Sequence, residues 1–142
     1  MIRNVHISHA WQIVELLRIL REESPEYNYV EDDPIWVANN MVHLIENETL
    51  VGVVDEDEGS DVRGFMIGFV SNPWYSKRVD AIEQLLYVHP DHRGGSIAIR
   101  LVKGFENVCR DRGAYELSVG ASTGMAESRT VKLYEKLGYT LR

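Results

Sequence analysis

Hydrophobic and polar residues alternate in several short segments of this chain, which is typical of β-strands with one buried face. The clearest alternation lies at Tyr115–Val119. In another segment, Phe65, Ile67 and Phe69 share one face. We predict strands over Met1–Ile7, Leu50–Val54, Val62–Val70, Ala81–Val88 and Tyr115–Val119.

Elsewhere apolar residues recur every three or four positions, as on the buried face of an amphipathic helix. The strongest stripe predicts a helix over Ile97–Arg112, and Gly113 fits the position just after a helix end. Three further helices are predicted, one carrying Ile13 to Leu20, one from Pro34 to Ile45 and one over Glu127–Leu137. Their expected boundary residues are Ser8 as an N-cap, Asp33 followed by proline, and Gly138.

These elements follow one another in the order β-α-α-β-β-β-α-β-α. The 142 residues contain no internal repeat, low-complexity tract or linker, so we expect residues 1–142 to form one domain. Such an order predicts a mixed α/β fold in which helices pack on a central sheet.

Charge and composition narrow the possible partners. The net charge of −7 argues against nucleic acid. No apolar run approaches the roughly 20 residues that cross a bilayer, so no membrane partner is expected. The sequence has a single cysteine, Cys109, and no basic-then-apolar leader, and we therefore expect a cytoplasmic protein. Cys109 lies on an apolar helix stripe, which predicts simple burial in the core.

The loop before the third helix is the strongest candidate for chemistry. Tyr87–Ala98 reads Y-V-H-P-D-H-R-G-G-S-I-A, so a strand ends at a proline turn and small residues lead into the helix. The first N–H groups of a helix lack partners, and with the helix dipole they form a site for phosphate groups. This pattern predicts a phosphorylated cofactor. No metal site is expected, because His89 and His92 have no cysteine pair nearby.

The same loop resembles the acetyl-coenzyme A signature of the GNAT N-acetyltransferases. That family's pattern is Q/R-x-x-G-x-G/A, and here Arg93 takes its first position, Ser96 that of the first glycine and Ala98 the last. A second segment, Leu133–Tyr139, reads L-Y-E-K-L-G-Y and resembles the family's L-Y-E-K-L-G-F/Y. A helix and a strand are expected between the two segments, as in the family.

This resemblance implies a twisted, mostly antiparallel central sheet that is splayed at the cofactor site and flanked by about four helices. It implies acetyl-CoA as the cofactor. The residues then expected to contact it are Leu86, Tyr87, Val88, Arg93, Gly94, Gly95, Ser96, Ile97, Ala98 and Glu127. Glu127 stands where many members have an asparagine. The sequence ends soon after the second segment, so we expect a shorter sheet or one that a partner chain completes.

The resemblance also assigns catalytic roles. Tyr134 matches the tyrosine that protonates the leaving thiolate, and a phenol pKa near 10 lies above that of a thiol. The attacking amine must lose a proton, and Glu83 is the expected base, with His89 or a chain of waters as the alternative. A backbone N–H around Leu86–Val88 is expected to face the acyl oxygen.

The acceptor side is indicated by charge. Between Glu22 and Asp33 lie six carboxylates and no lysine or arginine. In the family this connection borders the acceptor, so Glu31, Asp32 and Asp33 are expected to favour a cationic amine such as a polyamine, an aminoglycoside-like amine, a lysine or a protein N-terminus. Trp74 and Tyr75 are expected to line the mouth of the acceptor site.

The function implied is acetyl transfer from acetyl-CoA to a primary amine of a small molecule or peptide, by direct attack in a ternary complex. The alternative is a non-catalytic acyl-CoA-binding or protein-interaction module on the same fold. A homodimer is compatible with both functions. A third hypothesis is that the fold serves mainly as a dimeric scaffold.

Overall fold

The computed structural model describes residues 1–24, 33–120 and 127–140. Its elements are β1 (Ile2–Asn4), α1 (Ala10–Glu23), α2 (Pro34–Glu46), β2 (Leu50–Glu56), β3 (Val62–Ser71), β4 (Val79–Val88), α3 (Ile97–Asp111), β5 (Ala114–Ser118) and α4 (Glu127–Lys136). Short 3₁₀ turns lie at Ile7–His9 and Pro90–His92. The order of elements predicted from the sequence is confirmed.

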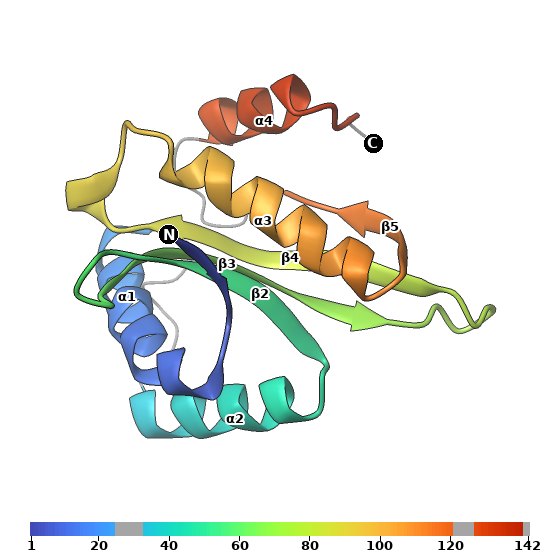
Figure 1. Cartoon of the computed structure of the whole chain (residues 1–142), viewed down its shortest axis with the longest axis horizontal. Coiled ribbons are helices and arrows are strands. Elements are labelled where there is room, and N and C mark those ends of the chain that lie inside the picture. The colour runs from blue at the N-terminus through green and yellow to red at the C-terminus, as the bar shows by residue number, and fades with distance from the viewer. Residues whose placement is uncertain (25–32, 121–126, 141–142) are drawn as a thin grey trace.

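The five strands form one open sheet in the order β1-β2-β3-β4-β5 (Figure 1). Neighbouring strands are antiparallel except β4 and β5, which run parallel. α1 and α2 cover one face of the sheet, and α3 and α4 lie on the other. The predicted mixed α/β fold, with a mostly antiparallel sheet and four helices, is confirmed.

Each face of the sheet has its own hydrophobic core. On one face, Ile13 and Leu20 of α1 and Met41 of α2 pack against the strands. On the other face, the predicted stripe of α3 is buried, from Ile97 to Cys109. Cys109 is 2% exposed, so its expected burial is confirmed. Every residue of β2 is buried, because this strand contacts both cores, and as far as Val54 it therefore shows a run without polar side chains rather than an alternation.

β4 and β5 pair over only part of β4. The parallel ladder joins Val79–Ile82 of β4 to β5 and stops there, although β4 continues to Val88. Among the described residues, no strand pairs with the second half of β4 on its β5 side, and we call this unpaired edge the gap. This is the splay that the family resemblance implied.

A one-residue bulge interrupts β4 at Gln84. Ile67 pairs with Leu85, whereas the next residue, Gly68, pairs with Glu83, so Gln84 has no pairing partner in β3. The extra residue resets the alternation of side chains along the strand. Glu83 reaches Tyr134 of α4 on one face, whereas Leu85 joins the core under α1 and α2 on the other. Without the bulge, Glu83 and Leu85 would share a face.

The element boundaries depart from prediction mainly at the N-terminus. The first strand is shorter than Met1–Ile7, and a 3₁₀ turn follows it. His6, not Ser8, caps this turn, since its side chain accepts the backbone N–H of Ser8 at 3.2 Å. α1 then begins at Ala10. The other boundary residues behave as expected: Asp33 caps α2, and Gly113 and Gly138 adopt φ of +78° and +97° after their helices.

Candidate active site

The loop between β4 and α3 combines an open backbone with an uncapped helix start. Gly94 has φ of +91°, a conformation that favours glycine, and no described atom lies within 4 Å of a Cβ built at Gly94 or Gly95. Ser96 is the N-cap of α3, but its side chain makes no capping hydrogen bond and instead accepts from Nε of Arg100 at 3.3 Å. The N–H groups of the first turn of α3 are therefore available to an anion.

In its splayed half, β4 turns backbone groups toward the gap beside β5. The N–H of His89 donates to the carbonyl of Arg63 at 2.8 Å. In an antiparallel ladder, residues that bond to the neighbouring strand alternate with residues that do not. The N–H and C=O groups of Leu86 and Val88 therefore point away from β3 and toward the gap. The carbonyl of Val88 accepts from Nε of Arg93, and an extended ligand can pair with the other three groups.

Tyr134 and Glu83 meet at the same part of the site. The Tyr134 hydroxyl, from α4, lies 3.5 Å from Oε1 of Glu83 on β4. Tyr134 is 4% exposed and Glu83 7% exposed. Burial, and then the charge of Glu83, raise the pKa of Tyr134 well above its usual value. The structure thus brings together the predicted acid and the predicted base, and it keeps the phenol protonated.

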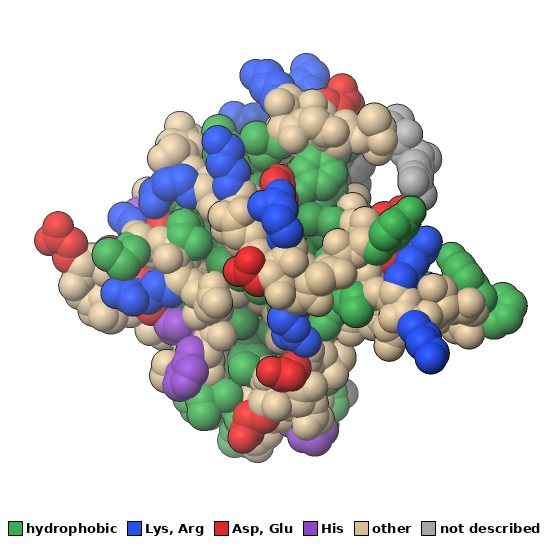
Figure 2. Space-filling model, turned by 45° about the vertical axis from the view of Figure 1, so that its right-hand side comes forward, with side chains coloured by type: hydrophobic (Ala, Val, Ile, Leu, Met, Phe, Trp, Pro, Cys, Tyr) green, Lys and Arg blue, Asp and Glu red, His purple; other side chains and the backbone are tan. Residues whose placement is uncertain are grey.

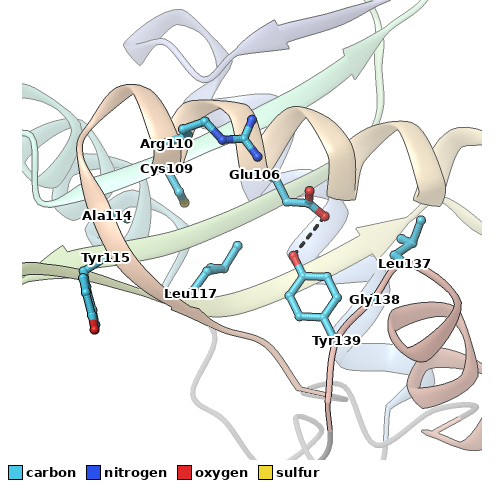
Figure 3. A pocket seen from close by; sticks show the side chains of 9 residues that line it. All are labelled: Glu106, Cys109, Arg110, Ala114, Tyr115, Leu117, Leu137, Gly138 and Tyr139. Atoms are coloured by element: carbon cyan, nitrogen blue, oxygen red, sulfur yellow. Dashed lines mark hydrogen bonds between the residues drawn. The ribbon is translucent and has the colours of Figure 1, made fainter.

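Tyr139 supports Tyr134 from the side. The two rings pack edge to face with their centroids 5.4 Å apart. The Tyr139 hydroxyl donates to Oε1 of Glu106 on α3 at 3.0 Å, as Figure 3 shows. Because α3 is packed tightly on the sheet, this contact ties the segment after α4 to a rigid element.

The pocket in Figure 3 lies between α3, β5 and Leu137–Tyr139 and has a volume of about 270 Å³. Neither Tyr134 nor Glu83 lines it. Cys109 does, but burial raises the pKa of its thiol to about 11. The thiol therefore stays protonated near neutral pH and is not prepared to act as a nucleophile.

Arg93 is held by a residue that the sequence reading did not single out. Its Nη1 and Nη2 donate to the two carboxylate oxygens of Glu23 at 3.0 and 2.6 Å, and its Nε donates to the carbonyl of Val88 at 2.9 Å. The Tyr87 hydroxyl also donates to Glu23. Hydrogen bonds from Arg93 hold the pKa of Glu23 below its usual value, although partial burial opposes the shift.

Two of the three carboxylates predicted to attract the acceptor, Glu31 and Asp32, lie outside the described residues. The third, Asp33, has a structural task, since its Oδ1 accepts the backbone N–H of Trp36 at 3.1 Å and caps α2. The predicted attraction of a cationic acceptor by this segment stays a prediction.

Trp74 and Tyr75 lie at the turn between β3 and β4, which projects beyond the sheet (Figure 1). They are 95% and 63% exposed, their ring centroids are 5.5 Å apart, and the guanidinium of Arg78 lies 5.7 Å from the centre of the Tyr75 ring. The structure does not bring them to Tyr134 and Glu83, and their place at the acceptor mouth stays a prediction.

Two further candidates are placed as follows. Glu127 is the first residue of α4, and its side chain lies outside the described residues. His89, the alternative base, accepts the backbone N–H of Asp91 at 3.0 Å and so caps the 3₁₀ turn after β4.

Among the described residues, no cluster of His, Cys, Asp and Glu could hold a metal ion, and no helix is long and apolar enough to span a membrane.

The acetyltransferase (GNAT) family model matches residues 13–139, which include both the loop before α3 and the segment around Tyr134. The chain belongs to the GNAT acetyltransferase family. This match also takes in most of α1 and all of α2. A search of curated proteins gave no match.

Solved structures with the same fold include acetyltransferases of varied origin. An aminoglycoside acetyltransferase from an uncultured soil metagenomic sample aligns with a TM-score of 0.77 at 19% identity, over 100% of this chain and 92% of its own. A ribosomal-protein-alanine N-acetyltransferase from Brucella melitensis biovar Abortus 2308 gives 0.73 at 19% identity, over 100% and 92%. A Trypanosoma brucei acetyltransferase gives 0.76 at 19%, over 100% and 93%. At this identity the likeness is one of fold.

Proposed function

We propose that this GNAT protein is an acetyl-CoA-dependent N-acetyltransferase that acts on a primary amine by direct attack in a ternary complex. The observation that carries the proposal is the buried Tyr134 hydroxyl 3.5 Å from the Glu83 carboxylate. These two groups supply an acid and a base beside the splayed end of β4. Acylation of an amine by a thioester needs both, because one proton must leave the nitrogen and one must reach the sulfur.

Acetyl-CoA fits the residues that border the splay. The first-turn N–H groups of α3 would bind its pyrophosphate, where Gly94 and Gly95 leave open space. The N–H groups of Leu86 and Val88 and the carbonyl of Leu86 would pair with its pantetheine arm as with an added strand. One of their N–H groups would also donate to the acyl oxygen as negative charge develops there. Bound in this way, the cofactor supplies an activated acetyl thioester.

Glu83 and Tyr134 then move the protons. Glu83 would accept a proton from the neutral amine nitrogen, directly or through a water, as the nitrogen bonds to the acyl carbon. An acceptor that arrives as an ammonium ion would first lose its extra proton to solvent. Tyr134 would donate its proton to the sulfur as the carbon–sulfur bond breaks, and its raised pKa keeps the phenol protonated until then. The proton on Glu83 can return to Tyr134 across the 3.5 Å contact, so the pair is restored and the net transfer is from amine to thiol.

The acceptor we propose is a cationic amine. The support is the acidic segment that ends at Asp33, which contains no lysine or arginine from Glu22 onward. The neighbours named above include enzymes for an aminoglycoside and for a ribosomal-protein alanine, so the fold accommodates both a small amine and a polypeptide.

The test of catalysis is Tyr134→Phe, assayed with a panel of cationic amines by thiol release from acetyl-CoA. Loss of an acid in the transition state should lower kcat by about 10²- to 10⁴-fold, while the Kd for coenzyme A stays near that of wild type. Tyr115→Phe is the matched control. It removes the same hydroxyl group from a side chain that is 74% exposed and lies far from Glu83. Unchanged kcat in Tyr134→Phe would remove the acid role. Coenzyme A binding without turnover of any amine by wild type would favour the interaction module.

The test of the acceptor is the reversal of charge at Glu31 and Asp32, with Asp33 left in place because it caps α2. The KM for cationic amines should rise while the KM for acetyl-CoA stays the same. If every cationic amine keeps its KM, the acidic segment does not select the acceptor.

A further inference from the structure

Two side chains, those of Arg93 and Tyr87, converge on Glu23, at the end of α1. The guanidinium of Arg93 binds both carboxylate oxygens, and the hydroxyl of Tyr87 donates to one of them. The same guanidinium lies 5.2 Å from the centre of the Tyr87 ring and reaches back to the carbonyl of Val88. We call Glu23, Tyr87, Arg93 and the Val88 carbonyl the Glu23 cluster.

The Glu23 cluster joins two parts of the chain that are 70 residues apart. In Figure 1 the end of α1 lies beside the loop that leads from β4 into α3. Both anchors are rigid: α1 is fixed by fully buried Leu20 one turn earlier, and Tyr87 is 2% exposed within the sheet. A bidentate arginine–carboxylate pair fixes both distance and orientation, and it sits directly before Gly94.

The pairing gives Arg93 a structural role. Three of its five N–H groups are used, two by Glu23 and one by the carbonyl of Val88. Arg93 therefore fixes the direction in which the loop leaves β4, next to the backbone N–H groups that begin α3.

We propose that Glu23 is a positioning residue for cofactor binding, which acts through Arg93 to hold the phosphate-binding loop at Gly94–Ser96 in its binding geometry before the cofactor arrives. The inference rests on the proposed use of acetyl-CoA. A loop that is ordered in advance loses less freedom on binding, so the benefit is found in affinity rather than in the chemical step.

The test compares Glu23→Gln with Glu22→Gln, a neighbouring exposed carboxylate that undergoes the same loss of charge. Glu23→Gln should raise the Kd for coenzyme A and the KM for acetyl-CoA by about tenfold, with kcat at saturating acetyl-CoA and the acceptor KM unchanged. Glu22→Gln should leave the Kd for coenzyme A and the KM for acetyl-CoA as in wild type. Adding Glu23→Gln to Arg93→Gln should cause no further loss, because Glu23 acts through Arg93.

A second readout requires no cofactor. In the free protein, the backbone order parameters of Gly94 and Gly95, measured by nitrogen-15 relaxation, should fall from about 0.85 toward 0.6 in Glu23→Gln but not in Glu22→Gln. If wild type binds coenzyme A and Glu23→Gln binds it equally well with an equally ordered loop, the inference is overturned. If wild type itself does not bind coenzyme A, the proposed function fails, and this inference fails with it.

Discussion

Replacement of Gly68 by alanine tests the bulge that places Glu83. A Cβ at Gly68 would lie 2.5 Å from the carbonyl oxygen of Ile82 and 2.7 Å from Cζ of Phe105, which is fully buried. Inserting one methyl group into a packed core costs about 1–3 kcal/mol, and a backbone carbonyl this close gives way only if β4 moves, so we expect about 3 kcal/mol. For 142 residues the unfolding entropy is about 0.3 kcal/mol per kelvin, and Tm should fall by about 10 °C.

Thermal unfolding and steady-state kinetics, measured on the same samples, check this expectation. Gly59→Ala is the control, since the nearest atom to its Cβ would be Asp57 Oδ1 at 3.4 Å, an ordinary contact in an exposed turn, and its Tm should stay within about 2 °C of wild type. The Cβ at Gly68 would also lie 3.1 Å from the Cα of Glu83, so kcat should fall below the melting transition too. A Tm loss under about 3 °C with unchanged kcat would refute this reasoning.

Three further outcomes follow from the structure. Burial raises the pKa of Tyr134, so the folded protein keeps the phenol proton at a pH where the unfolded chain begins to lose it. The free energy of unfolding should therefore fall above about pH 10, while kcat should not decline between about pH 8 and pH 10. An inflection of kcat near about pH 9 would contradict this. Cys109, with its thiol pKa raised to about 11, should resist iodoacetamide at pH 8 in the native protein and react once the protein is unfolded in urea. Asp55 is fully buried and accepts from Nε of Arg63 at 2.7 Å and from Nη1 of Arg100 at 3.1 Å. Asp55→Asn should therefore lower the free energy of unfolding, measured in urea, by about 3–5 kcal/mol. A loss below about 1 kcal/mol would show that these ion pairs are dispensable.

Periodicity along the chain was sufficient to predict the elements and their order, because each long segment repeats its apolar residues often enough to define a face. It was wrong at Met1–Ile7, where the alternation covers too few residues to distinguish a strand from the 3₁₀ turn that His6 caps. Periodicity also could not predict the bulge at Gln84. Two adjacent polar residues, Glu83 and Gln84, are the only local sign, and they fit a regular strand equally well.

For the candidate site, the sequence indicated which residue types take part but not which side chains contact one another. Tyr134 and Glu83 were proposed separately, and their contact depends on the bulge and on how α4 packs, which no local pattern encodes. Glu23 was one of six carboxylates in an acidic run, and nothing nearby distinguished it from Glu22. Its partner Arg93 lies 70 residues away, so only the folded chain reveals the pair.

The gap beside β4 offers a direct way to watch the site being filled. Amide deuterium exchange in the free protein should be faster at Leu86 and Val88, whose N–H groups point away from β3, than at Leu85 and Tyr87, which bond to β3. A ligand that adds to the sheet as a strand would slow the first pair and leave the second as it was. Protection that changes at every second residue would therefore report the bound arm of the cofactor without any measurement of turnover.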